Sequence, residues 1–227
     1  MGLVVAKEPF HFYTRLHLKE LTGLKATDLP SLLSLIRTVP GSSIYYHTHH
    51  FLQQHQFLSP EPPNDFAYWV SEALGEDALG EKLAGIDTVQ FHTLRSLREK
   101  LAETIESHLK THPRSAQRSA PDGEPFYFMK SVSFILPTPY MATTLKEFAE
   151  VLKKISVHSL YFHIFEARLR LEQPTNDFAL WLKENLQEEK LAQQVEFLDP
   201  YTHTLESLRE KLITLVEKRI AANAVAE

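Results

Sequence analysis

The chain has 227 residues, no cysteine and a formal net charge of -5, and 43% of its residues are hydrophobic. This composition predicts a folded protein with a substantial core, and it excludes disulfides, thiolate metal sites and cysteine nucleophiles. The mildly acidic charge argues against broad binding to nucleic acid or to a membrane surface. The sequence has neither a signal peptide nor the roughly 20 apolar residues of a membrane helix, so we expect a cytoplasmic protein.

The first predicted element is a short strand at residues 10–18, where FHFYTRLHL alternates aromatic or branched residues with polar ones. Helices are predicted to follow at residues 29–39 and from Ser42, where the sequence reads SSIYYHTHHFLQQH. The segment NDFAYW at residues 64–69 predicts another helix, because Asn or Asp can cap the first turn. An amphipathic helix is predicted from apolar residues three and four apart, namely Leu94, Leu97, Leu101, Ile105 and Leu109.

The same elements return in the same order in the second half of the chain. Three pairs of segments carry this match: EPFHF and EPFYF at 8–12 and 124–128, NDFAYW and NDFALW at 64–69 and 176–181, and HTLRSLREKL and HTLESLREKL at 92–101 and 203–212. The order and spacing predict a tandem duplication of one unit.

We place the first repeat unit at residues 8–110, an exposed polar linker at 111–123 and the second repeat unit at 124–221. The predicted fold is mainly α, with two tandem homologous helical units packed as one globular body around a pseudo-two-fold axis. Each unit begins with one short strand, and we expect the two strands to pair with each other.

The motifs SIYYHTHHF, PNDFAYW and HTLRSLREKL, in this order, resemble the bacterial domain-of-unknown-function family 5752. The resemblance covers essentially the whole chain. It implies no established activity and transfers no catalytic residue. Some relatives in that family occur near sugar-active enzymes, including glycosyltransferases and trehalose or glycogen enzymes. The resemblance therefore implies a link to carbohydrate metabolism.

The strongest candidate for chemistry is the histidine-rich helix of each half. His47 and His50 are three residues apart and share a helix face, and the equivalent positions of the second half are His163 and Glu166. A two-fold arrangement of the helices would gather these four side chains into a site for a divalent transition metal. The alternative is a pair of core helices whose histidines are hydrogen-bonded among aromatic neighbours.

His92 and His203 form a second candidate site, because each directly precedes the Thr-Leu that opens the last helix of its half. A histidine there can bind a ligand or act as a general acid or base. The simpler interpretation, which we favour, is a helix-entry residue bonded to a neighbouring loop. Asp65 and Asp177 could be general bases, but their place before an apolar helical face favours helix capping.

The sequence contains no GxGxxG, GxSxG, HExxH or phosphate-binding glycine loop. This absence favours a non-enzymatic binding or regulatory module, with a protein or a small metabolite as its partner and a role linked to carbohydrate metabolism. The alternative is a metal-dependent enzyme or sensor that uses the His47/His50 and His163/Glu166 helices. Nucleic-acid and membrane partners are not expected.

Overall fold

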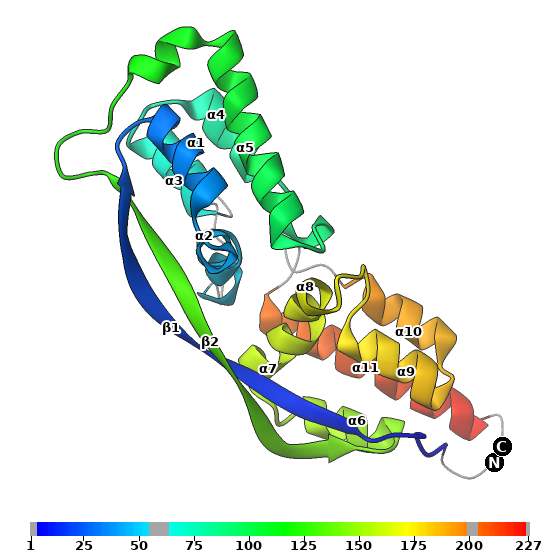
Figure 1. The fold of residues 1–227 in the computed structure, drawn as a ribbon. Helices are drawn as coiled ribbons and strands as arrows, with labels where there is room; N and C mark the ends of the chain where they lie inside the picture. The colour runs from blue at the N-terminus through cyan, green and yellow to red at the C-terminus, as the bar shows by residue number, and fades with distance from the viewer. Residues whose placement is uncertain (1–3, 55–63, 199–203, 226–227) are drawn as a thin grey trace. The chain divides into compact units, whose positions relative to one another are not determined.

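The computed structural model describes residues 4–54, 64–198 and 204–225. Two long strands, β1 (Phe10–Ala26) and β2 (Phe126–Ala142), pair in an antiparallel ribbon, and helices lie against it (Figure 1). No helix within these ranges is both long enough and apolar enough to cross a membrane.

The chain forms two compact units, and both strands pass from one unit into the other. Of the described residues, the N-terminal unit comprises 17–54 and 64–133, and the C-terminal unit comprises 4–16, 134–198 and 204–225. The helices of the N-terminal unit are α1 (Leu29–Thr38), α2 (Gly41–Gln54), α3 (Asp65–Glu72), α4 (Asp77–Ala84), η1 (Thr88–Gln90), α5 (Leu94–Thr111) and η2 (Pro113–Gln117). Those of the C-terminal unit are α6 (Leu145–Leu152), α7 (Val157–Tyr161), η3 (Phe162–Glu166), α8 (Ala167–Leu171), α9 (Asp177–Leu186), α10 (Glu189–Glu196) and α11 (Leu205–Val225).

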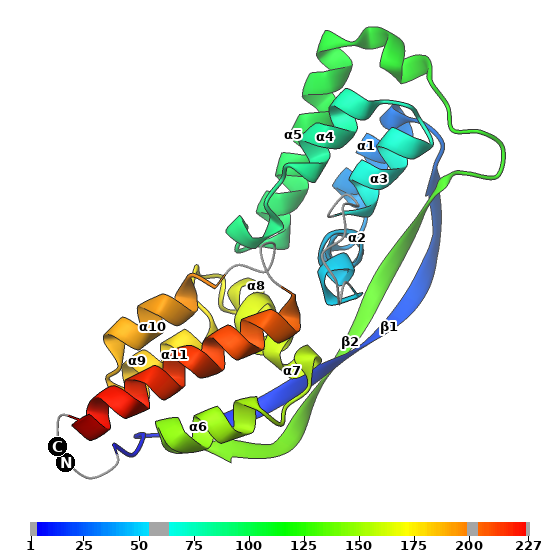
Figure 2. The same ribbon diagram turned by 180° about the vertical axis from the view of Figure 1, so that it is seen from behind.

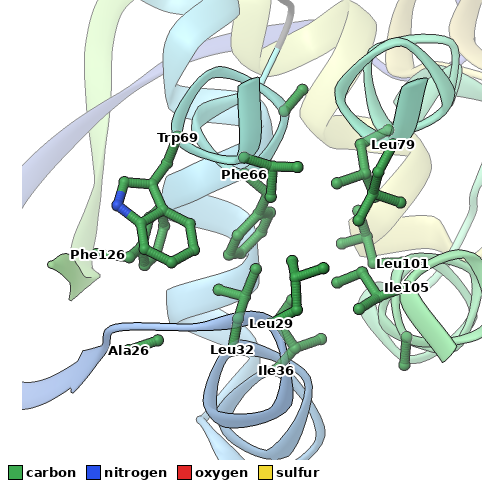
Figure 3. Close-up of a cluster of buried hydrophobic side chains, with 14 of the residues drawn as sticks. Ala26, Leu29, Leu32, Ile36, Phe66, Trp69, Leu79, Leu101, Ile105 and Phe126 are labelled. Carbon is green, nitrogen blue, oxygen red and sulfur yellow. The ribbon is translucent and has the colours of Figure 1, made fainter. Parts of the chain in front are cut away.

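The core of the N-terminal unit lies between its helices and the first residues of β2. Phe126 of β2 stacks on Phe66 of α3 with the ring centroids 5.1 Å apart, and both rings are buried (Figure 3). The indole N–H of Trp69 donates a hydrogen bond of 2.8 Å to the carbonyl oxygen of Glu124. The start of β2 is therefore part of this core.

The core of the C-terminal unit is built in the same way around the first residues of β1. Phe10 and Phe12 are buried against Phe148 of α6, at centroid distances of 6.0 and 5.7 Å. The indole N–H of Trp181 donates a hydrogen bond of 2.8 Å to the carbonyl oxygen of Glu8. Seen from behind, α11 closes this unit and lies beside α6 and α10 (Figure 2).

The prediction of two tandem units with one short strand each is wrong. Each strand has 17 residues, and each compact unit combines segments from both ends of the chain. The reason is an exchange of strands between the two halves of the sequence. The aromatic residues at the start of β1 pack against the helices of the second half, and those at the start of β2 pack against the helices of the first half. Because the two halves carry the same aromatic motif, the sequence repeat does not reveal which half a strand covers. The boundaries at 8–110, 111–123 and 124–221 remain a prediction about the sequence repeat alone.

Most helices lie where the apolar spacing predicts them. The predicted helices at 29–39 and 94–109 correspond to α1 and α5, and the helix predicted from Ser42 corresponds to α2. Asp28 caps α1 by accepting a hydrogen bond of 2.8 Å from the backbone N–H of Ser31, and the Ser31 hydroxyl accepts in turn from the backbone N–H of Asp28, which completes a capping box.

Candidate functional site

The histidine-bearing helix of the C-terminal unit contains a π-helical turn. This turn, η3, joins α7 to α8 without a break, and His163 lies within it with only 2% of its surface exposed. π-helical turns are rare in proteins, and those that occur are frequently found at functional sites. The side chains around His163 therefore form the first candidate site.

Both ring nitrogens of His163 are hydrogen-bonded. The backbone N–H of Tyr13 in β1 donates to Nε2 at 2.8 Å, so Nε2 carries no proton and Nδ1–H donates to Asp177 Oδ2 at 2.7 Å. One helical turn earlier, the Ser159 hydroxyl donates to the carbonyl oxygen of Tyr13 at 2.6 Å. Ser159 and His163 thus bond both backbone groups of one strand residue, as a neighbouring strand would.

The N-terminal unit repeats this arrangement at β2. The backbone N–H of Met129 donates to His47 Nε2 at 2.9 Å, and His47 Nδ1–H donates to Asp65 Oδ2 at 2.8 Å. The Ser43 hydroxyl donates to the carbonyl oxygen of Met129. A serine and a histidine four residues apart on a helix therefore close one strand edge in each unit.

These His–Asp pairs hold strands in place and do not present a catalytic base. Burial lowers the pKa of His163 below its ordinary value of 6.5, and the nearby Asp177 carboxylate only partly offsets this effect. The ring is therefore neutral at physiological pH. A general base needs a lone pair that faces the substrate, whereas the lone pair of Nε2 accepts the Tyr13 N–H.

The capping role predicted for Asp65 and Asp177 belongs to the asparagine before each of them. The side-chain oxygen of Asn64 accepts from the backbone N–H of Ala67, and that of Asn176 accepts from Ala179, each at 2.9 Å. The aspartates at the next position instead accept the histidine protons. The Asn-Asp-Phe motif therefore combines a helix cap, a histidine acceptor and a core aromatic ring.

The C-terminal unit adds an arginine to its His–Asp pair. Arg170 Nη2 lies 2.5 Å from Asp177 Oδ2, and the guanidinium carbon lies 4.9 Å from the centroid of the Phe162 ring. The carboxylate and the aromatic face together fix the guanidinium plane. Arg170 remains exposed to solvent, so it can also contact a ligand.

A cavity of about 420 Å³ opens beside this group, entirely within the C-terminal unit. Its volume falls within the range of small-molecule sites. The residues that line it carry carboxylate, amide, imidazole and guanidinium groups beside apolar and aromatic side chains: Pro9, Phe10, His11, Tyr13, Ile135, Phe162, His163, Arg170, Asp177, Leu180, Trp181, Glu184 and Asn185. This mixture suits a small ligand with both apolar faces and hydrogen-bonding groups.

The structure describes the side chains of three of the four predicted metal ligands, His47, His163 and Glu166. Glu166 lies in the same π turn as His163, but its carboxylate binds Arg15 Nη1 at 2.8 Å. The side chain of His50 lies outside the described residues. Among the described side chains, no group of three or more His, Asp or Glu residues could hold a metal ion. Metal binding by His47, His50, His163 and Glu166 stays a prediction.

His92 and His203 are placed only in part. The Nδ1 atom of His92 is buried and has no hydrogen-bond partner among the described residues, and His203 lies outside them. The next residue, Thr93, caps α5 by accepting a hydrogen bond of 3.1 Å from the backbone N–H of Ser96. The ligand-binding role of the two histidines stays a prediction.

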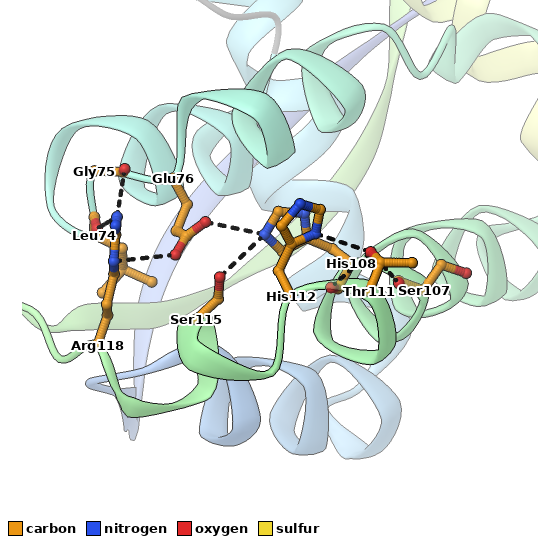
Figure 4. Close-up of polar contacts among 9 residues, drawn as sticks. All are labelled: Leu74, Gly75, Glu76, Ser107, His108, Thr111, His112, Ser115 and Arg118. Atoms are coloured by element: carbon orange, nitrogen blue, oxygen red, sulfur yellow. Dashed lines mark hydrogen bonds and ion pairs between the residues drawn. The ribbon is translucent and has the colours of Figure 1, made fainter.

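Sequence reasoning did not identify a second polar cluster, which lies in the N-terminal unit. Glu76 Oε2 bonds His108 Nε2 at 3.0 Å, and Arg118 Nε lies 3.3 Å from Glu76 Oε1 (Figure 4). Burial raises the pKa of Glu76, but hydrogen bonds from Ser115 and His108 and the charge of Arg118 outweigh it, so the pKa lies below its ordinary value. In the C-terminal unit the corresponding carboxylate, Glu188, binds Arg219 at 2.6 Å. Glu76 and Glu188 occupy corresponding positions, so a comparison of the two halves of the sequence is the signal that could have identified this carboxylate.

The fold and these contacts define a class of protein: a helical module with a long two-stranded ribbon and a solvent-facing cavity beside a buried histidine. The chain belongs to a family of unknown function, DUF5752, whose model matches residues 7–217. It is similar to the solved structure of OrfY from Thermoproteus tenax, with 28% sequence identity and a TM-score of 0.80, over 94% of this chain and 96% of that one. A search of curated proteins finds no match.

Proposed function

We propose that the protein is a binding module for a small hydroxylated metabolite of the sugar class, and that the cavity beside Arg170 and Asp177 holds the ligand. The observation that carries this proposal is the lining of the cavity, which includes Glu184, Asn185 and His11 together with apolar side chains. Hydroxyl groups both donate and accept hydrogen bonds, so they suit a mixture of carboxylate, amide and imidazole partners. The apolar face of a sugar ring suits Tyr13 and Ile135.

Family context agrees with this choice of ligand. The resemblance to the family implies a link to carbohydrate metabolism, and we propose a regulatory role for the module there, in the cytoplasm. The Ser–His–Asp contacts that recur in both units also support an internal duplication of the sequence. Since the sequence has Gln54 at the position that corresponds to Arg170, we propose that the two copies have diverged in ligand binding.

Isothermal titration calorimetry with a panel of monosaccharides, disaccharides and sugar phosphates tests the proposal. We expect at least one ligand of the panel to bind. Replacing Glu184 by Gln is expected to weaken that binding about tenfold, because a hydrogen bond to a charged group contributes roughly 1.5–3 kcal/mol.

The matched control is Glu72→Gln, because Glu72 occupies the position of Glu184 on α3 of the N-terminal unit and is exposed. We expect this variant to bind as tightly as the unaltered protein. Absence of binding by every compound in the panel would overturn the proposal. An equal loss in both variants would show that the ligand does not occupy this cavity.

A further inference from the structure

Each strand of the ribbon has an outer edge, which faces away from the other strand. In each unit, the helices hydrogen-bond the outer edge of one strand, and the outer edge of the other strand lies on the opposite side of the ribbon. In the N-terminal unit, Ser43 and His47 of α2 bond the backbone of Met129 and close the outer edge of β2. In the C-terminal unit, Ser159 and His163 close the outer edge of β1 at Tyr13. The opposite edges are residues 134–142 of β2 and residues 17–25 of β1.

Prolines occur on the first of these opposite edges and are absent from the second. Thr22 of β1 and Thr138 of β2 occupy equivalent positions in their strands. The Thr22 hydroxyl donates to Phe128 O at 2.6 Å, and the Thr138 hydroxyl donates to Phe12 O at 2.7 Å. In this alignment Pro137 and Pro139 of β2 correspond to Leu21 and Gly23 of β1. Proline removes a backbone donor and blunts a strand edge against pairing. The edge of β1 keeps its donors.

The backbone of β1 directs these donors away from the ribbon. Met129 points toward α2, so its neighbours Phe128 and Lys130 point toward β1. The Thr22–Phe128 bond and the 2.9 Å ion pair between Glu20 and Lys130 place these residues opposite one another. Leu21, between Glu20 and Thr22, therefore turns its N–H and C=O outward. Among the described residues, no backbone–backbone hydrogen bond outside the helices and the ribbon involves residues 19–25, and the Leu24 N–H donates to the Thr22 hydroxyl at 3.1 Å.

Exposed leucines flank this edge at a regular spacing. Leu18, Leu21 and Leu24 have 51%, 57% and 40% of their surface exposed. They lie three residues apart, so the pattern is symmetric about Leu21. An edge strand with outward-facing backbone groups, such as those of Leu21, and with exposed apolar side chains is a template for another strand.

We propose that this edge of β1 pairs antiparallel with the same edge of a second copy of the chain, centred on Leu21. In that register Leu21 faces Leu21 of the second copy, and Leu18 faces its Leu24. Lys19 faces Gly23, and Glu20 faces Thr22, so no like charges lie opposite each other among these residues. The two ribbons then form one four-stranded sheet, and each leucine buries part of its exposed surface against the leucine that faces it.

Disulfide trapping tests this register directly, because the chain has no cysteine of its own. In the proposed pairing the Cα atoms of the two Leu21 residues are about 5.5 Å apart, a distance that a disulfide can span. We expect Leu21→Cys to form a covalent dimer under mild oxidation of the dilute protein. Lys19→Cys is the matched control on the same exposed edge, since its two copies would be about 13 Å apart, at roughly 3.3 Å per residue.

Sedimentation equilibrium of the cysteine-free protein supplies the second measurement. We expect the mass to rise toward that of a dimer with concentration, and Leu21→Pro, which copies Pro137, to weaken the association about tenfold. Leu136→Lys, on β2 of the C-terminal unit, should leave it unchanged. Equal cross-linking of the two cysteine variants, a monomer at all concentrations, or equal association of Leu21→Pro would overturn the proposal.

Discussion

His163 Nδ1 lies 2.7 Å from Asp177 Oδ2, and this bond fixes which nitrogen of the imidazole carries the proton. The opposite nitrogen can only accept, because its partner is the backbone N–H of Tyr13. The imidazole ring therefore accepts a hydrogen bond from the strand at Nε2 and donates one to the first residue of α9 at Nδ1. His47 and Asp65 repeat the relationship in the N-terminal unit. These hydrogen bonds give His47 and His163 the same structural role in the two units.

Replacing His163 by Ala is expected to lower the free energy of unfolding by roughly 2–4 kcal/mol. The substitution leaves the Tyr13 N–H without its partner and removes packing against Phe10, whose ring centroid lies 4.9 Å from that of the imidazole. An unpaired buried polar group costs roughly 1–3 kcal/mol, and the lost packing adds to this. Chemical denaturation followed by circular dichroism measures the change.

His47→Ala should have an effect of similar size, because its contacts are equivalent. Ser159→Ala should cost less, about 1 kcal/mol, since it removes one hydrogen bond and little volume. A wild-type unfolding free energy for His163→Ala would contradict the strand-holding role.

Unfolding of the protein should also depend on pH through His163. Its pKa is lowered by burial in the folded state, whereas the unfolded chain has the ordinary value of 6.5. Above pH 6.5 neither state binds a proton there, so the group does not alter stability. As pH falls from 6.5 toward the folded-state pKa, the unfolded chain binds a proton that the folded chain does not, and stability decreases by up to roughly 1.4 kcal/mol per pH unit.

Urea denaturation at intervals from pH 8 to pH 5 measures this dependence. His163→Gln supplies the control, because the amide does not titrate and can still accept from Tyr13. We expect the variant to lose less stability than the unaltered protein below pH 6.5. Identical pH profiles for the two proteins would show that His163 does not contribute.

The helices could be predicted because each depends on neighbours in sequence. The spacing of Leu97, Leu101 and Ile105 fixes the buried face of α5, and the side-chain oxygens of Asn64 and Asn176 cap α3 and α9. These signals are local, and they recur in both halves. Residue spacing was therefore sufficient for them.

The strand exchange and the partners of the histidines could not be predicted in this way. Phe10 packs on Phe178, 168 positions further along the chain, and Phe126 packs on Phe66 in the other half. Either half could have supplied either aromatic pair, because the motifs match. The assignment depends on long-range packing, and so does the bond between His163 and the backbone of Tyr13.

Added zinc should not stabilise the protein through His47. Both of its ring nitrogens are hydrogen-bonded, so a metal would have to displace Asp65 or the Met129 N–H. Thermal denaturation of protein purified without a histidine tag, with and without zinc, measures the effect. A stabilisation that His47→Ala abolishes while the fold persists would instead support the metal site predicted from sequence.

Gln187→Gly should raise the free energy of unfolding by about 1 kcal/mol. Gln187 follows α9 with a φ of 58°, a left-handed conformation, and the corresponding residue after α3 is Gly75 with a φ of 62°. A side chain at such a φ costs roughly 1–2 kcal/mol, of which the greater chain entropy of glycine in the unfolded state cancels a part. The reciprocal change, Gly75→Ala, should lower the free energy of unfolding by a similar amount. Urea denaturation of both variants measures the pair, and a loss of stability in Gln187→Gly would show that its side chain makes a stabilising contact that outweighs the backbone strain.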